Sequence, residues 1–143
     1  MKKTILFISI LAISSFSCCQ ENPGSFFGQN LPGDSPTVFA DGIVTYPFMN
    51  HSSVTLSNEM NEMYWSKWYD EESRQEIVYS ELNGNKWSEP EVVSFSGQYS
   101  DDVPFLSPDN RRLYFVSRRP AGQDDNSNRE RIWFSSKDNV DTW

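Results

Sequence analysis

The residues of this chain best suited to covalent chemistry are two adjacent thiols, Cys18 and Cys19. They follow a start with two lysines and a mostly apolar stretch, residues 4–13, which is the order of an export signal. Residues 15–18 read Ser-Phe-Ser-Cys, and a small residue before a cysteine is typical of a thiol that receives lipid and becomes the mature N-terminus. We therefore predict lipidation of Cys18. Cys19 is the alternative acceptor, and ordinary signal cleavage is the other interpretation.

The apolar stretch is too short to cross a membrane as a stable helix, so the sequence favours a lipid-anchored protein over a membrane-spanning one. Residues 1–17 are predicted to be a lipoprotein signal peptide. Residues 18–36, rich in Gly, Pro, Asn, Ser and Gln, are predicted to be a flexible tether. The expected location is the bacterial cell envelope, at the outer membrane facing the periplasm or the exterior. No cysteine follows Cys19, which excludes a disulfide framework for the folded part.

Side chains that could support catalysis are present but scattered. Asp101, Asp102 and Tyr114 are of the types that glycosidases of the sialidase kind use, yet such an enzyme needs arginines and carboxylates that converge from a complete ring of repeats. Their positions match elements of an internal repeat better than active-site loops. We predict no catalytic residues, and the sequence favours a binding protein over an enzyme.

Metal and cofactor sites are also not expected. His51 is the only histidine, so the sequence offers no histidine cluster for a metal. Residues 124–130 place oxygen ligands at alternating positions, as calcium loops do, but lack the glycine and the final glutamate of such loops. A solvated hairpin loop is the simpler interpretation.

The charge of the chain limits its partners. The net charge is −8, whereas nucleic acids and anionic lipid surfaces attract proteins with a surplus of Lys and Arg. We therefore expect no nucleic-acid partner. The basic residues gather only at the two ends of one predicted strand, where solvated sheet edges are expected: Arg111, Arg112, Arg118 and Arg119.

These residues are set in a chain that repeats itself. Residues 56–65, LSNEMNEMYW, return without a gap as residues 106–115, LSPDNRRLYF, a shift of 50 positions. Residues 77–80 match 132–135, and Trp87 matches Trp143. A period of this length, made of short aromatic and β-branched runs separated by turns, is typical of β-propeller blades. The sequence thus predicts an all-β fold.

The second repeat predicts its own strands and turn. A short strand is expected over residues 104–106, a turn over 107–110 (Ser-Pro-Asp-Asn) and a strand over 112–117, because proline and asparagine suit the conformations that a tight turn requires. Residues 113–116 and 63–65 form almost continuous apolar runs, the pattern of strands covered on both faces. Upstream, residues 41–46 match 90–95, and both are expected to form outer strands.

Residues 100–120, SDDVPFLSPDNRRLYFVSRRP, resemble the WD40-like repeat of the TolB type, also called PD40. The resemblance extends over residues 27–143, with Asn110 at a position where the family usually has glycine. It implies a TolB-like β-propeller of about two blades, residues 37–143, with blade-like units at 41–90 and 91–143, the second incomplete. The expected whole is a six-bladed ring of which this chain is a fragment.

A second resemblance overlaps the first. Residues 136–143, SKDNVDTW, look like the Asp-box turn of sialidase-like propellers, with Val140 in place of glycine. Residues 80–87 occupy the matching place and keep Gly84 and Trp87 but have Leu82 where the box has aspartate. The box holds a blade together and lies away from catalytic centres, so it supports a propeller and not a hydrolase.

Together these features lead to a functional expectation. The chain is expected to be a cell-envelope lipoprotein that docks envelope proteins or glycans without catalysis, since TolB-like proteins have such partners. The alternative is a sialidase-like glycan hydrolase or glycan-binding propeller. Self-association is a further hypothesis, in which the strand expected over residues 41–46 completes the second unit of a neighbouring copy and three copies close a ring.

Overall fold

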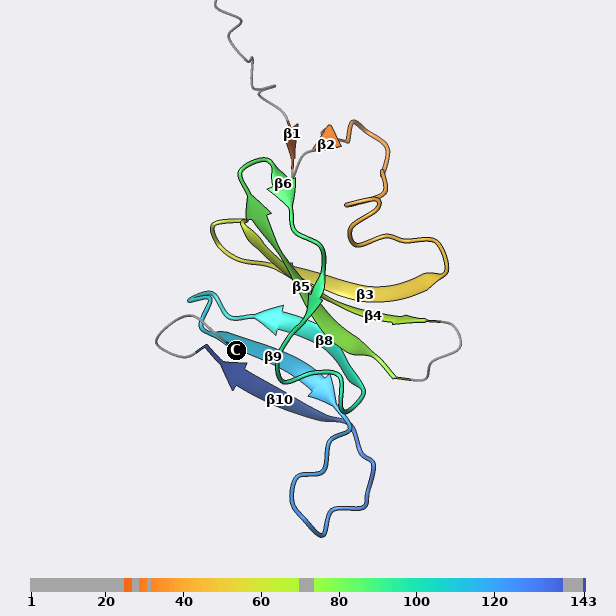
Figure 1. The fold of residues 1–143 in the computed structure, drawn as a ribbon, viewed down its shortest axis with the longest axis vertical. Helices are drawn as coiled ribbons and strands as arrows, with labels where there is room; N and C mark the ends of the chain where they lie inside the picture. The colour runs from red at the N-terminus through yellow and green to blue at the C-terminus, as the bar shows by residue number, and fades with distance from the viewer. Residues whose placement is uncertain (1–24, 27–28, 31, 70–73, 138–142) are drawn as a thin grey trace, which may run out of the picture.

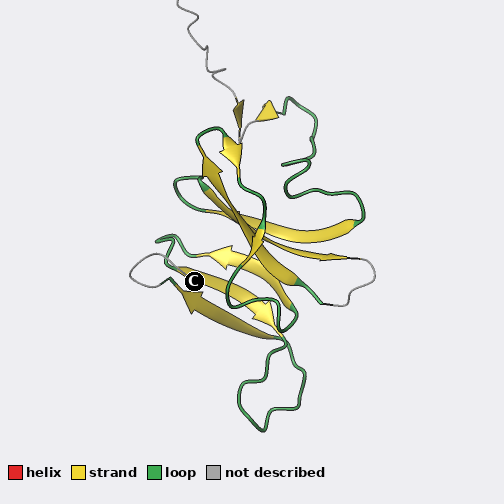
Figure 2. Cartoon of the chain, in the orientation of Figure 1, coloured by secondary structure: helices red, strands yellow, loops and turns green. Residues whose placement is uncertain are grey.

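The described residues of the computed structural model are 25–26, 29–30, 32–69, 74–137 and 143. Within these ranges every regular element is a β-strand (Figure 2), which confirms the predicted all-β class. No helix in the described part of the chain is long and apolar enough to cross a membrane. The predicted signal peptide, residues 1–17, and the predicted lipid acceptor Cys18 lie outside the described residues.

Two antiparallel sheets account for most of the fold, and they lie one above the other (Figure 1). The first, called sheet 1 here, has the order β3-β4-β5-β6 with β7 paired to β5. Its strands are β3 (Met49–Leu56), β4 (Glu62–Tyr69), β5 (Glu76–Asn83), β6 (Lys86–Trp87) and β7 (Glu91–Val92). β7 falls within residues 90–95, where the sequence predicts an outer strand.

Sheet 2 has the order β10-β9-β8. Its strands are β8 (Asp101–Leu106), β9 (Arg112–Ser117) and β10 (Arg131–Ser136). The bounds of β9 are the predicted ones, while β8 begins before the predicted residue 104. A separate two-stranded ribbon, β1 (Ser25–Phe26) with β2 (Gln29–Asn30), lies in the segment predicted as a tether.

The turn between β8 and β9 forms as its residue types predict. Asn110 adopts a φ of 57°, the left-handed conformation that asparagine tolerates better than most residues. Its backbone N–H donates to the carbonyl of Ser107 at 2.8 Å, and Ser107 Oγ accepts from the N–H of Arg112 at 2.9 Å.

The first repeat closes the same turn with different residues. Met60, at the position of Asn110, has a φ of 56° and donates its N–H to the carbonyl of Ser57 at 2.9 Å. Ser57 Oγ accepts from the N–H of Glu62 at 3.0 Å. The shared serine and backbone geometry show that the sequence repeat is also a structural repeat.

Each sheet has two faces, which we name by equivalent positions of the repeat. The leading face carries Leu56, Met63, Trp65 and Val78 in sheet 1 and Leu106, Leu113, Phe115 and Trp133 in sheet 2. The trailing face carries Tyr64, Ile77 and Tyr79 in sheet 1 and Tyr114, Ile132 and Phe134 in sheet 2. The trailing face of sheet 1 packs on the leading face of sheet 2 in one buried cluster. Because both faces of β4 are covered, Met63, Tyr64 and Trp65 are all buried, as their continuous apolar run predicts.

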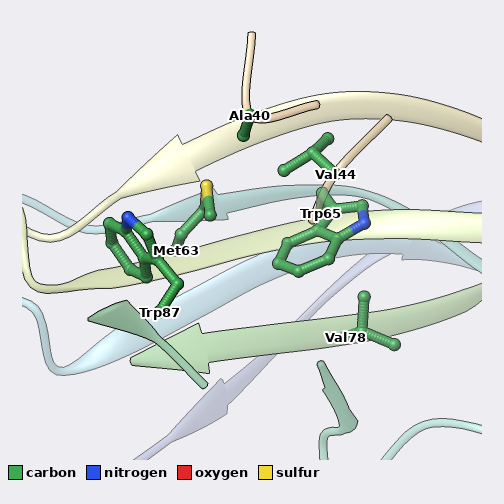
Figure 3. Packing of buried hydrophobic residues seen from close by; sticks show 6 residues of the cluster. All are labelled: Ala40, Val44, Met63, Trp65, Val78 and Trp87. Carbon is green, nitrogen blue, oxygen red and sulfur yellow. The ribbon is translucent and has the colours of Figure 1, made fainter. Parts of the chain in front are cut away.

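The leading face of sheet 1 is covered by a segment of the chain itself, residues 39–44, which we call the cap. Ala40 and Val44 of the cap are buried against Met63, Trp65 and Val78 (Figure 3). The prediction of a strand over residues 41–46 is therefore wrong. These residues form a compact turn with one isolated bridge, Asp41 to Thr45, because Gly42 takes a φ of 78° and lets the chain fold back on itself.

The prediction that residues 113–116 are covered on both faces is also wrong. Leu113 and Phe115 are buried, but Tyr114 and Val116 are only half-buried. The reason is that sheet 1 covers the leading face of sheet 2, whereas the trailing face of sheet 2 faces solvent.

Candidate interaction surface

An exposed apolar surface lies on the trailing face of sheet 2. Phe105, Tyr114 and Phe134 form one row across the three strands, since Tyr114 pairs in register with both phenylalanines. The rings of Tyr114 and Phe134 are 5.8 Å apart. In the next row Ile132 pairs with Val116. We call these five residues the open face.

The exposure of the open face is large for side chains of this kind. Phe105 is 58% exposed, Phe134 62% and Ile132 78%. Isolated exposed apolar residues are normal, but a contiguous group on one sheet face indicates an interaction site. Cross-strand pairs of aromatic and β-branched residues also stabilise the sheet that presents them, so the surface is built on a rigid element.

The local sequence explains why these side chains share one face. Along β10 the side chains alternate, so that Ile132 and Phe134 point to solvent while Trp133 packs against the buried cluster between the two sheets. In β8 a register shift between Asp102 and Phe105 brings Phe105 to the same side as Tyr114. Val103, inside that shift, has a φ of 53° and is 47% exposed.

The equivalent face of sheet 1 has the opposite environment. Tyr64 and Ile77 are 1% and 0% exposed, respectively, because sheet 2 covers them. The backbone N–H of Leu106 in sheet 2 donates to Thr55 Oγ1 in sheet 1 at 3.2 Å. Thr55 holds in sheet 1 the place that Phe105 holds in sheet 2, next to the paired tyrosine. The open face thus occupies the repeat positions that form a sheet-to-sheet contact in sheet 1.

Ion pairs border the open face. Arg118 and Glu130 pair at 2.8 Å, and Arg112 lies 3.9 Å from Asp109. The side chains of both pairs are about half exposed, so each pair contributes little to stability. An apolar centre with a charged rim is the usual anatomy of a protein interface.

Asp101, weighed as a catalytic carboxylate, has a structural role instead. Its side chain is fully buried and pairs with Arg119 at 2.8 Å, while Oδ2 accepts from Ser96 Oγ at 2.8 Å. The guanidinium of Arg119 lies 4.8 Å from the ring centre of Phe115 and donates to the carbonyl of Phe95. The expectation that Arg119 is solvated at a sheet edge is therefore wrong, because its planar cation stacks on aromatic rings at the sheet contact.

The other candidates for chemistry do not gather into one site. Asp102 Oδ1 accepts from Ser52 Oγ at 2.5 Å and from the N–H of Val103 at 2.7 Å, and Tyr114 lies on the open face. His51 is exposed, and its Nδ1 lies 3.4 Å from the carbonyl of Met49. The structure thus gives these side chains separate surroundings.

The loop at residues 124–130, whose oxygen ligands alternate as in calcium loops, is held by its own hydrogen bonds. Asp125 Oδ1 accepts from the hydroxyl and the N–H of Ser127, and Oδ2 accepts from the N–H of Ala121. Arg131 pairs with the same carboxylate at 2.9 Å. These donors, the hydroxyl of Ser127 first, hold the pKa of Asp125 far below its usual range. In the described part of the chain no three His, Cys, Asp or Glu side chains gather as metal ligands would.

A pocket of about 360 Å³ lies at one end of the sheet contact. Its walls include Tyr79 and Trp143, with Glu81, Glu91 and Lys137. Lys137 Nζ pairs with Glu62 at 2.8 Å. Aromatic rings beside carboxylates offer stacking and hydrogen-bond acceptance to a sugar.

Tyr64 forms the inner wall of this pocket. Its hydroxyl donates to Glu62 at 2.8 Å and accepts from the indole N–H of Trp143 at 3.0 Å. Burial raises the pKa of Tyr64 well above its ordinary value of 10.0, although the Trp143 hydrogen bond acts the other way.

Reasoning from the sequence did not identify Phe105, Ile132 and Phe134 as interaction residues. The available signal was the repeat itself, because Ile132 and Phe134 match Ile77 and Tyr79. No family model, curated protein or solved structure matches this chain.

Proposed function

We propose that this chain is a non-catalytic docking protein of the bacterial cell envelope, with its two sheets as consecutive blades of a TolB-like β-propeller. The open face carries the proposal. It is apolar, exposed and contiguous, and its repeat-equivalent positions in sheet 1 already form a sheet-to-sheet contact.

The open face favours a particular kind of partner. In sheet 1 the trailing face receives Leu106, Leu113 and Phe115, a flat set of aliphatic and aromatic side chains on one sheet. The chemistry that complements the open face is therefore another β-sheet with alternating Leu, Phe or Trp residues. This points to a protein partner, with affinity from apolar burial and orientation from the charged rim.

A photo-cross-linker at position 134 tests this docking. On intact envelopes we expect cross-links to a protein segment with alternating apolar residues, identified by sequencing the linked peptide. Ile132→Lys should suppress the cross-link, because a charge at the open face would have to be buried on docking. The same linker at exposed Asn126 is the matched control. Cross-links to lipid only, or cross-links unchanged by Ile132→Lys, would refute docking at this face.

Membrane anchoring is the second part of the proposal and rests on the sequence around Cys18. Two acyl groups on one cysteine together give stable anchoring where a single chain does not. Cys18→Ala should release the protein from membranes and abolish palmitate labelling. Labelling that persists would move the acceptor to Cys19, and a variant that stays on membranes without label would end the lipid proposal.

Glycan binding is a second candidate function, favoured by the pocket beside Tyr79 and Trp143. Binding is preferred to hydrolysis, since Asp101 and Asp102, the carboxylates considered for catalysis, do not line this pocket, and Asp101 is held in an ion pair. Quenching of tryptophan fluorescence by envelope oligosaccharides, lost in Tyr79→Ala and retained in Phe134→Ala, would support this candidate. No quenching by any oligosaccharide would remove it.

A further inference from the structure

The cap covers the leading face of sheet 1. By the repeat, this face is equivalent to the leading face of sheet 2, which packs on the trailing face of sheet 1. Met63, Trp65 and Val78 under the cap are the repeat equivalents of Leu113, Phe115 and Trp133, and these three pack on the trailing face of sheet 1. The chain therefore carries both halves of the sheet-to-sheet contact, one exposed on sheet 2 and one hidden by residues 39–44.

The cap is held mainly by side-chain packing. Ala40 is 5% exposed and Val44 3% exposed, both against the leading face of sheet 1. The backbone bonds of the cap close on itself, from the N–H groups of Ile43 and Val44 to the carbonyl of Ala40, both at 2.9 Å. The N–H of Ala40 also donates to Gln29 Oε1 at 3.0 Å, and the hydroxyl of Thr45 donates to the carbonyl of Phe39 at 3.2 Å.

This construction lets the cap leave without breaking the ladder of sheet 1, because β3, β4 and β5 pair with one another in register without any cap residue. Ala40 also holds a φ of 48°, a conformation that costs a residue with a Cβ some free energy. Once the cap leaves, Met63, Trp65 and Val78 would face solvent and need another cover.

We propose that residues 39–44 block self-association, and that the partner admitted when they leave is a second copy of this chain. The open face of one copy would stack on the uncovered leading face of sheet 1 in the next, repeating between molecules the contact within each molecule. Such a head-to-tail contact closes into a ring if its rotation allows and otherwise continues as a filament. The inference rests on the proposed function, because it uses the same open face.

Sedimentation velocity over a concentration series tests the block in the full chain with both cysteines changed to serine. The unaltered cap should keep the chain monomeric. Val44→Glu should displace the cap, since a carboxylate cannot stay buried against Trp65 unpaired, and should produce assemblies that grow with concentration. Asp41→Lys is the matched control, because Asp41 is exposed on the cap and its change should leave a monomer.

A second substitution tests the open face. Phe134→Lys added to Val44→Glu should return the chain to a monomer, and a peptide with the sequence of residues 37–46 should do the same by covering the vacated face. If circular dichroism shows that Val44→Glu has lost its strands, Val44→Ala takes its place and should lower the concentration of half-association at least about tenfold, the factor that 1.4 kcal/mol of cap contact represents.

Three results would overturn the inference. A folded cap variant that remains monomeric would show that the cap blocks nothing. Assemblies that survive Phe134→Lys would show that they form through another surface. A dimer of the capped chain that Phe134→Lys dissolves would mean that two open faces meet each other, which contradicts head-to-tail stacking but leaves docking at the open face intact.

Discussion

The trailing faces of the two sheets carry equivalent residues in opposite surroundings. Ile77 is fully buried and Ile132 is 78% exposed, although both pair at the same position of the same repeat. Tyr64 and Tyr114 differ in the same direction. The difference comes from the neighbour: sheet 2 covers the trailing face of sheet 1, and among the described residues no element covers that of sheet 2.

This contrast shows how a repeat protein separates strand formation from burial. The strand, its register and its turn arise from local sequence in both repeats, whereas the free energy of apolar burial depends on the next repeat. A repeat with an exposed trailing face is therefore folded but lacks the sheet-to-sheet contact that the trailing face of the other repeat makes. If burial, and not residue identity, makes the two repeats differ, equivalent substitutions should have unequal effects in the two sheets.

The largest expected effect is at the buried ion pair of Asp101 in β8 with Arg119, which follows β9 in the same sheet. Asp101→Ala should lower the free energy of unfolding by about 3–5 kcal/mol, because it leaves Arg119 without its carboxylate at a buried site. Glu130→Ala removes the rim pair with Arg118 and should cost about 1 kcal/mol or less. Urea unfolding of both variants measures the difference. Equal losses would mean that burial does not make the Asp101 pair more important than the exposed one.

The matched isoleucines give the most direct test of the comparison. Ile77→Ala should cost about 2–5 kcal/mol, since it removes methyl groups from a packed contact and leaves a cavity. Ile132→Ala should change stability by about 0.5 kcal/mol or less, as exposed substitutions do. Thermal and urea unfolding of the pair provide the measurement. A large loss at Ile132 would show that the open face is covered in solution.

Tyr64 makes the covered contact sensitive to alkali. Its pKa is raised in the folded state above the ordinary 10.0, chiefly by burial, so the unfolded chain releases this proton first as the pH rises. The contribution of Tyr64 is therefore complete below pH 10 and declines above it. We expect Tyr64→Phe to lose less stability than the unaltered chain between neutral pH and pH values above 10. Identical losses would show that Tyr64 ionises freely in the fold.

The smallest expected effect is at the turn of the second repeat, where Asp109 stands at the position that Glu59 has in the first repeat. The hydroxyl of Ser107 and the N–H of Arg111 donate to Asp109 Oδ1, at 2.5 and 3.1 Å, and lower the pKa of Asp109 below its ordinary 3.8. The stabilisation by this carboxylate is present above pH 3.8 and is lost as the pH falls through the lower folded value. Carboxyl carbon titration by NMR should show a midpoint below 3.8 that rises in Ser107→Ala. An unchanged midpoint in that variant would remove the serine as its cause.

Much of the fold could be predicted from residue types and their spacing. The all-β class, the exact bounds of β9, the turn at residues 107–110 and the double coverage of residues 63–65 all arise from local patterns. Turn formers and alternating apolar residues act over a few positions, so they are readable without a tertiary structure.

The candidate surface could be predicted only in part. The repeat identifies Ile132 and Phe134 as equivalents of Ile77 and Tyr79, but it does not say that one set is covered and the other exposed. The strand predicted over residues 41–46 was wrong because Gly42 and the burial of Val44 favour a compact turn over an extended strand. The surroundings of Arg119 were not predicted because two of its aromatic neighbours, Tyr99 and Trp133, belong to other segments of the chain.

The sequence by itself determined the all-β class, strand β9 and the turn at residues 107–110, because these depend on residues close together in the chain. Lipidation of Cys18 stays a prediction from the same kind of local pattern. Only the tertiary structure decided which faces are covered, that residues 39–44 act as a cover, and that Asp101 and Arg119 form a buried pair. These outcomes depend on apolar surface and charge meeting across long sequence separations. A local pattern does not indicate which of two equivalent faces another part of the protein will cover.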